Sequence, residues 1–174
     1  MIIDEIFTKY WNQITIFLFA IGYFVKLVFD NLKNKREINH NLFQQNRLNS
    51  LNRFFKSYSG VEQMLISMPI FDILDRKISA KQLDTIVFPP LNDLKASVVE
   101  LQIYFKPEDH LLFKEILNNI ILVKDKIGEL YLRLNRYNND IAESNTYQYI
   151  RIDKLKENEK LLDKISFMIQ ETFK

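Results

Sequence analysis

The residues best able to bind a metal ion or move a proton at neutral pH are the two histidines, His40 and His110. They fall on different expected helices, and neither has a second ligand three or four residues further along the chain. Because a metal site needs converging ligands, the sequence predicts no metal centre. His110 falls in the first turn of its expected helix, where we expect a solvated surface side chain.

Nucleophilic catalysis has no support in the sequence either. The chain contains no cysteine, and its serines lack the strand–turn–helix context of a nucleophile elbow. The adjacent carboxylates Glu108 and Asp109 are explained by the preference of a helix N-terminus for negative charge. With only three glycines, a Gly-rich phosphate loop is absent as well. We therefore expect a protein that is not an enzyme and uses no cofactor.

Two polar side chains interrupt an apolar seam with the three-and-four spacing of a helix face. The seam consists of His40, Phe43, Arg47, Leu51, Phe54, Tyr58, Val61, Leu65 and Met68. A cation on a seam must be paired, solvated or reserved for a ligand. Either the helix enters its core only near Leu51 and the preceding turns stand in water, or several copies surround a polar cavity. In the second case His40 and Arg47 would receive an anionic ligand, such as a nucleotide or nucleic acid.

A second set of polar and small residues lies inside the most apolar stretch of the chain. Its members keep the helical spacing and so share one face: Asn12, Thr15, Phe19, Gly22 and Lys26. Polar groups within a membrane usually face protein or water. Either Lys26 extends to a nearby interface while Asn12 and Thr15 already lie in the other one, or this face mediates self-association and lines a pore.

A third set interleaves arginines with tyrosines, which can stack on bases and neutralise phosphates of a single-stranded nucleic acid. It comprises Arg133, Arg136, Tyr137, Tyr147, Tyr149 and Arg151. Such residues are also ordinary at the loop end of a helical bundle, and the sequence contains no recognisable nucleic-acid-binding fold. Both interpretations stay open.

The element that positions these residues is the apolar stretch 10–29, YWNQITIFLFAIGYFVKLVF. As a helix it would cover ~30 Å, the thickness of the hydrocarbon core of a bilayer. Tyr10 and Trp11 stand at one end, where such rings prefer the membrane interface. The sequence predicts a transmembrane helix, and the alternative is a soluble protein with this helix in its core.

Basic residues follow the stretch in excess: Lys33, Lys35, Arg36, Arg47, Arg53 and Lys56, against Asp30 and Glu37. Positive charge stays on the cytoplasmic side of a membrane. We therefore expect residues 1–9 outside the bacterial cytoplasmic membrane, residues 10–29 within it and residues 30–174 in the cytoplasm. A cleaved signal peptide is disfavoured, because the start of the chain is not basic and no small-residue cleavage site follows.

The remaining chain predicts an all-α fold, an antiparallel bundle of about four helices that assembles into an oligomer. Pro69 ends a long helix from residue 36 to 68. Residues 70–90 form a connector, with a short helix opened by a capping box at Ser79 and closed by Phe88-Pro89-Pro90. Further helices are expected over 91–105, 108–135 and 152–173. Residues 136–144 form a polar loop, and the strand-like alternation in 146–152 is interpreted as loop and helix start.

The stretch after the apolar segment, KREINHNLFQQNRL (Lys35 to Leu48), carries a resemblance. Across residues 14–58 the chain resembles small bacterial single-span membrane proteins with a cytoplasmic helical domain, of the kind found as membrane effectors in anti-phage defence modules. The resemblance implies an oligomer that disrupts or conducts across the inner membrane after a regulatory signal.

We therefore expect a membrane-anchored oligomeric effector whose helical domain senses a ligand or partner and whose anchor helices form or gate a pore. A non-conducting membrane-tethered module that recruits a cytoplasmic partner is the first alternative. A membrane-anchored nucleic-acid-binding protein is the second.

Overall fold

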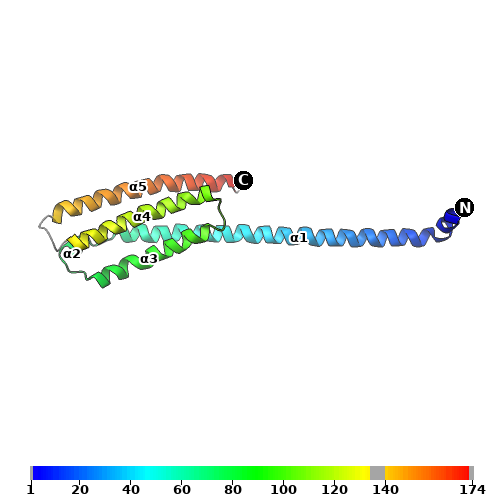
Figure 1. Ribbon diagram of the computed structural model, residues 1–174, viewed down its shortest axis with the longest axis horizontal. Coiled ribbons are helices and arrows are strands. Elements are labelled where there is room, and N and C mark those ends of the chain that lie inside the picture. The colour runs from blue at the N-terminus through cyan, green and yellow to red at the C-terminus, as the bar shows by residue number, and fades with distance from the viewer. Residues whose placement is uncertain (1, 134–139, 173–174) are drawn as a thin grey trace. The chain divides into compact units, whose positions relative to one another are not determined.

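The computed structural model describes residues 2–133 and 140–172, and 91% of the chain is helical with no strand in those ranges. Figure 1 shows the helices in chain order. They are α1 (Ile2–Ile66), α2 (Ile70–Leu74), α3 (Ala80–Leu101), α4 (Pro107–Arg133) and α5 (Asp140–Thr172). The all-α prediction is confirmed.

The chain divides into two compact units, residues 1–46 and residues 47–174. We call them the N-terminal unit and the C-terminal unit and describe each by itself. The N-terminal unit comes from α1 alone, whereas the C-terminal unit combines the last part of α1 with the other helices. Residues 30–46, assigned above with the helical domain, fall in the N-terminal unit.

The helix boundaries near Pro69 and Pro107 follow the predictions. α1 ends at Ile66, just before Pro69, which is the N-cap of α2. α4 begins at Pro107 with Glu108 and Asp109 in its first turn. Proline at the first helical position loses no hydrogen bond, and acidic groups there oppose the positive end of the helix dipole.

The capping box at Ser79 is confirmed, but the helix that it opens is longer than expected. Ser79 Oγ accepts from the backbone N–H of Gln82 at 3.3 Å, and the Ser79 backbone N–H donates to Gln82 Oε1 at 2.9 Å. We expected Pro89 and Pro90 to end this helix, and that was wrong, since α3 continues to Leu101.

Burial on both sides of the prolines explains why α3 continues. An interior proline costs about 3 kcal/mol in a helix, whereas burying one large apolar side chain contributes about 1.5–3 kcal/mol. The buried face of α3 runs through the proline pair without a break: Leu83, Val87, Leu91, Leu94, Ser97, Val98 and Leu101. The combined burial therefore outweighs the lost hydrogen bonds.

α5 begins at Asp140, well before the expected Ile152. Residues 146–152 are helical, so neither the strand-like pattern nor the loop interpretation of this segment holds. The buried side chains Ser144 and Tyr147 are three residues apart, which is helical and not strand spacing. Of the expected polar loop, residues 140–144 belong to α5 and residues 136–139 lie outside the described ranges.

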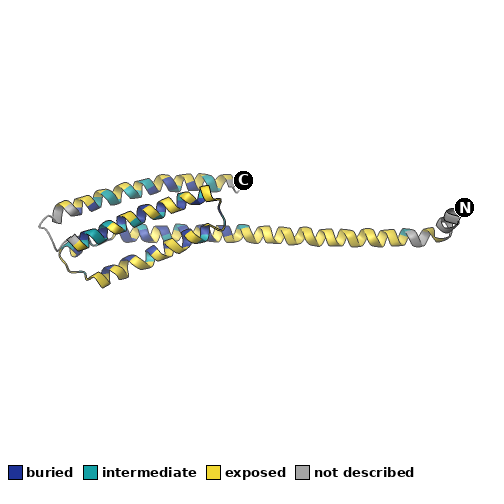
Figure 2. Ribbon diagram, in the orientation of Figure 1, coloured by how far each residue is buried: buried dark blue, intermediate teal, exposed yellow. Residues whose placement is uncertain are grey.

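The hydrophobic core lies in the C-terminal unit, with buried residues from α1 to α5 (Figure 2). Phe54 of α1 and Phe113 of α4 are both fully buried and meet edge to face, with ring centroids 4.9 Å apart. The expected seam of α4 is confirmed over its described members: Phe113, Ile116, Ile120, Val123, Ile127 and Leu130 are all buried. On α1 the seam is buried from Arg47 onward, whereas His40 and Phe43 are exposed.

Candidate functional site

The apolar stretch of α1 is exposed in this chain. Ile16, Phe19 and Phe24 keep about two thirds or more of their surface accessible, at 69%, 76% and 68%, and Figure 2 shows the same for the neighbouring turns. The most apolar window has a mean hydropathy of 1.6, and none of it is buried. The core helix of a soluble protein would be mostly buried. Among the described residues this is the one candidate membrane-spanning helix.

The polar face within this stretch is exposed at its described members, except for Thr15, which is half-buried. Phe19, Gly22 and Lys26 are exposed, and apart from the adjacent backbone of α1 itself, no described atom lies within 4 Å of the position that a Cβ on Gly22 would take. The Thr15 hydroxyl donates to the backbone carbonyl of Trp11 at 2.9 Å, so its polar group is satisfied within the helix. The side chain of Asn12 lies outside the described part of the chain.

Arg47 is a contact within the C-terminal unit. Its side chain is 8% exposed, and its guanidinium carbon lies 4.3 Å from the ring centroid of Phe105, in the turn between α3 and α4. Burial lowers the pKa of Arg47, and the charge of Asp109 on α4 opposes that shift. The core therefore begins one turn before Leu51. Arg47, the first residue of α1 in this unit, links α1 to the α3–α4 turn.

We expect Arg47→Ala to destabilise the C-terminal unit by about 1–2 kcal/mol, because it removes a desolvated cation–π contact and the packing of the side-chain stem. Arg53→Ala is the matched control. Arg53 pairs with Glu100, but its side chain is 66% exposed, so its loss should cost about 0–1 kcal/mol. Thermal unfolding of the full chain in detergent measures both, and equal midpoints for the two variants would contradict the assignment.

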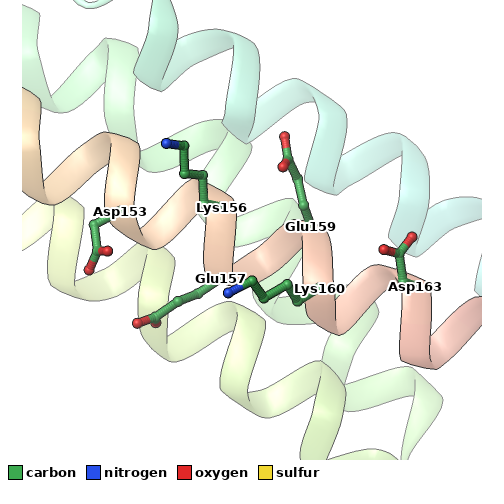
Figure 3. A pocket seen from close by; sticks show the side chains of 6 residues that line it. All are labelled: Asp153, Lys156, Glu157, Glu159, Lys160 and Asp163. Atoms are coloured by element: carbon green, nitrogen blue, oxygen red, sulfur yellow. The ribbon is translucent and has the colours of Figure 1, made fainter.

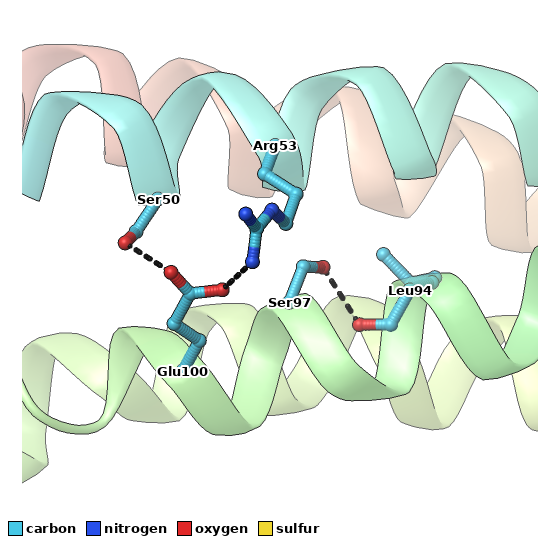
Figure 4. Close-up of polar contacts among 5 residues, drawn as sticks. All are labelled: Ser50, Arg53, Leu94, Ser97 and Glu100. Atoms are coloured by element: carbon cyan, nitrogen blue, oxygen red, sulfur yellow. Dashed lines mark hydrogen bonds and ion pairs between the residues drawn. The ribbon is translucent and has the colours of Figure 1, made fainter. Parts of the chain in front are cut away.

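Glu100 on α3 joins two residues of α1 that the sequence analysis did not single out (Figure 4). Its Oε1 accepts from Ser50 Oγ at 2.7 Å, and its Oε2 accepts from Arg53 Nη1 at 2.6 Å. Ser97, one turn earlier on α3, donates instead to the carbonyl of Leu94 in its own helix at 2.8 Å. No pattern within a short window could reveal the first pair, because Ser50 and Glu100 are far apart in sequence.

A polar group also lies in the middle of the core. Asn119 Nδ2 of α4 donates to Asn158 Oδ1 of α5 at 2.9 Å, and both side chains are buried. Nearby on α1, Tyr58 donates to Glu62 Oε1 at 3.3 Å, and burial raises the pKa of the Tyr58 hydroxyl. The sequence gave no signal for this pair, because the two asparagines lie on different helices, far apart in the chain.

Two members of the proposed nucleic-acid set, Tyr147 and Arg151, instead donate hydrogen bonds to the last carbonyls of α1. Arg151 Nη1 donates to the carbonyls of Leu65 and Ile66 at 3.1 and 3.3 Å. The Tyr147 hydroxyl reaches the Leu65 carbonyl at 3.5 Å, with its ring buried. The last carbonyls of a helix have no partner within it, so these donors satisfy groups that would otherwise be orphaned.

Of the other four members of that set, Tyr149 is the one whose side chain the structure describes. Tyr149 is 74% exposed. The side chain of Arg133 is not among those described, and Arg136 and Tyr137 fall in 134–139, outside the described ranges. Among the members whose side chains are described, the structure brings together Tyr147 and Arg151, and the guanidinium carbon of Arg151 lies 5.8 Å from the Tyr147 ring centroid.

The expectation that His110 is solvated was wrong. The side chain is 3% exposed, and its Nε2 lies 2.7 Å from the carbonyl oxygen of Val98 on α3. α3 and α4 are joined by a short turn, so the first turn of α4, which carries His110, packs against the last turns of α3. The imidazole is buried in this contact. His110 and the exposed His40 belong to different units.

Figure 3 shows a shallow hollow on α5, lined by Asp153, Lys156, Glu157, Glu159, Lys160 and Asp163. Four of these side chains are acidic and two are basic. Within the described ranges, no three or more carboxylate or imidazole side chains are placed, here or elsewhere, so that they could hold one metal ion. The hollow has the features of a solvated helix surface.

Burial also determines how the tyrosines respond to pH. Burial raises the pKa of Tyr147 from its ordinary value of 10.0 to about 12, although the charge of Arg151 opposes the shift. In the unfolded chain this hydroxyl loses its proton near pH 10, so the folded state binds more protons between those values.

We therefore expect stability that is fully present below pH 10 and lost progressively up to about pH 12. The loss assigned to Tyr147 is about 1.4 kcal/mol at pH 11 and rises to on the order of 2–3 kcal/mol above about pH 12. Chemical unfolding of the full chain in detergent at pH 8 and pH 11 measures it, with Tyr147→Phe as the variant and the exposed Tyr149→Phe as the control. An unchanged pH dependence in Tyr147→Phe would contradict this expectation.

Comparison of the chain with protein-family models, with curated protein sequences and with solved structures found no match.

Proposed function

We propose that the protein is a membrane-anchored effector that assembles into an oligomer, with the apolar part of α1 forming or gating a pore. The observation that carries this proposal is the exposed apolar stretch of α1, none of whose most apolar window is buried in the chain. Apolar surface of this extent needs a bilayer or protein to cover it. The face with Thr15, Gly22 and Lys26 would meet its copies in the assembly.

In this proposal the C-terminal unit is an antiparallel four-helix bundle in the cytoplasm of a bacterium, and the N-terminus of α1 lies outside the inner membrane. The excess of lysine and arginine after the apolar stretch supports this orientation. The role in anti-phage defence rests on the resemblance of residues 14–58 to such effectors.

His40 and Arg47 remain the proposed receivers of a regulatory signal, an anionic ligand or a partner protein. Arg47 rests on Phe105, so an anion that bound its guanidinium would compete with that contact. Release of the contact would free the α3–α4 turn from α1 within the C-terminal unit. In this proposal, binding of the ligand or partner acts on the protein by changing the contacts of this turn.

The test is the oligomeric mass of the full chain in detergent. We expect a discrete higher oligomer in which Gly22→Leu weakens assembly, because a large side chain on the shared face separates the helices. Ala20→Leu is the matched control: Ala20 is also small and exposed, but it lies on the other side of the helix. A monomer with the native sequence would contradict the proposal.

A second candidate is a membrane-tethered interaction module that conducts nothing. It is favoured by large apolar side chains that stay exposed on the C-terminal unit, among them Phe71 at 77% and Phe167 at 63%. A monomeric mass together with retained function after exchange of residues 10–29 for an unrelated span would favour this candidate.

A further inference from the structure

Two sets of residues that the sequence analysis treated separately lie on one face of α1. Because α1 is helical without a break from Ile2 to Ile66, the three-and-four spacing of Gly22 and Lys26 carries forward in register. The next positions in that spacing are Phe29, Lys33, Arg36 and His40. All lie in the N-terminal unit, and all are exposed.

This face is rich in positive charge. Lys26, Lys33 and Arg36 fall within ~80° of one another around the helix axis, at 100° per residue. Lys35 points away from them, ~160° from Lys33. The nearest acidic groups, Glu37 and Asp30, lie ~40° and ~60° from Lys33, at the edge of the face. The centre of the face is therefore cationic over almost three turns.

In the proposed pore, the charge on this face would affect which ions can pass. In an oligomer whose copies turn this face toward a common axis, each cation becomes a ring of like charges. Rings of lysine or arginine favour anions in a pore, as rings of acidic residues favour cations. The low dielectric constant of the surrounding helices and lipid concentrates the field of such rings inside the pore.

We propose that the pore conducts small inorganic anions in preference to cations, with selectivity set by Lys33 and Arg36 beyond the apolar stretch and by Lys26 near its end. This inference rests on the proposed function. Along the helix, Lys33 lies ~10 Å and Arg36 ~15 Å beyond Lys26, so an ion would pass several cationic rings in succession.

The test is the reversal potential of the full chain reconstituted in planar bilayers of neutral lipid, measured across a potassium chloride gradient. We expect the sign that chloride permeation gives, with a chloride-to-potassium permeability ratio of about ten or more. Lys33→Glu should abolish or invert this preference, and Lys33→Gln should lower it without adding an acidic group.

Lys35→Glu is the matched control, because it changes the net charge by the same amount two residues away on the opposite face. It should leave the reversal potential unchanged. Potassium preference in the native chain, or equal shifts from Lys33→Glu and Lys35→Glu, would overturn the inference while leaving a pore. Absence of any conductance from the native chain would overturn both the inference and the proposed function.

Discussion

A chain carrying Leu18→Arg and Ile21→Arg is expected to leave the membrane fraction. Both side chains lie in the middle of the apolar stretch and are exposed, at 63% and 46%. An arginine at the centre of a membrane-spanning helix costs about 2.5–3.5 kcal/mol, so the pair should lower the partition into the bilayer by roughly four orders of magnitude. The measurement is the share of the protein that resists an alkaline wash of cell membranes.

The control for this pair adds the same charge elsewhere on α1. Leu42 and Leu48 are also exposed, at 51% and 44%, but they lie beyond the apolar stretch. Leu42→Arg with Leu48→Arg should therefore remain with the membranes. If both double variants divided equally between membrane and soluble fractions, the apolar stretch could not be the anchor.

The second large effect is expected in the core, where Phe54→Ala should destabilise the C-terminal unit by about 3–5 kcal/mol. Phe54 is fully buried, and its ring meets Phe113 at 4.9 Å and Phe55 at 5.5 Å between centroids. Truncation would remove these contacts and leave a cavity that the surrounding helices fill only in part. Thermal unfolding in detergent should show a fall in midpoint on the order of 10 °C.

Phe71→Ala is the matched control for the core prediction. It removes the same ring from a side chain that is 77% exposed, so stability should change by no more than about 0.5 kcal/mol. A loss in Phe54→Ala as small as that in Phe71→Ala would mean that Phe54 is not part of a close-packed core.

Local chemistry made part of this fold predictable. The apolar face of α4, the capping box at Ser79 and the proline at the start of α4 each depend on residues within one or two turns. The error at Pro89-Pro90 has the opposite cause. The cost of the prolines is local, whereas the burial that offsets it comes from packing against distant parts of the chain, which a window of sequence does not show.

The candidate sites divide in the same way. The exposed apolar stretch and its polar face followed from composition and spacing. Three contacts did not: Arg47 with Phe105, Arg151 with the carbonyls of α1, and His110 with Val98. Each contact joins two elements, so the sequence singled out one side chain of each contact but could not identify its partner.

The buried asparagines also restrict how the helices can slide past one another. Leu161, Ile165 and Ile169 recur at four-residue spacing in the last part of α5, so shifting α5 by one turn would still place aliphatic side chains in that part of the core. It would also separate Asn119 from Asn158 and break the hydrogen bond between their amides. A buried amide without a partner costs about 1–3 kcal/mol, so the slipped arrangement would lose about twice that amount. The asparagine pair therefore acts as a register mark, selecting one alignment among several that apolar packing alone would tolerate.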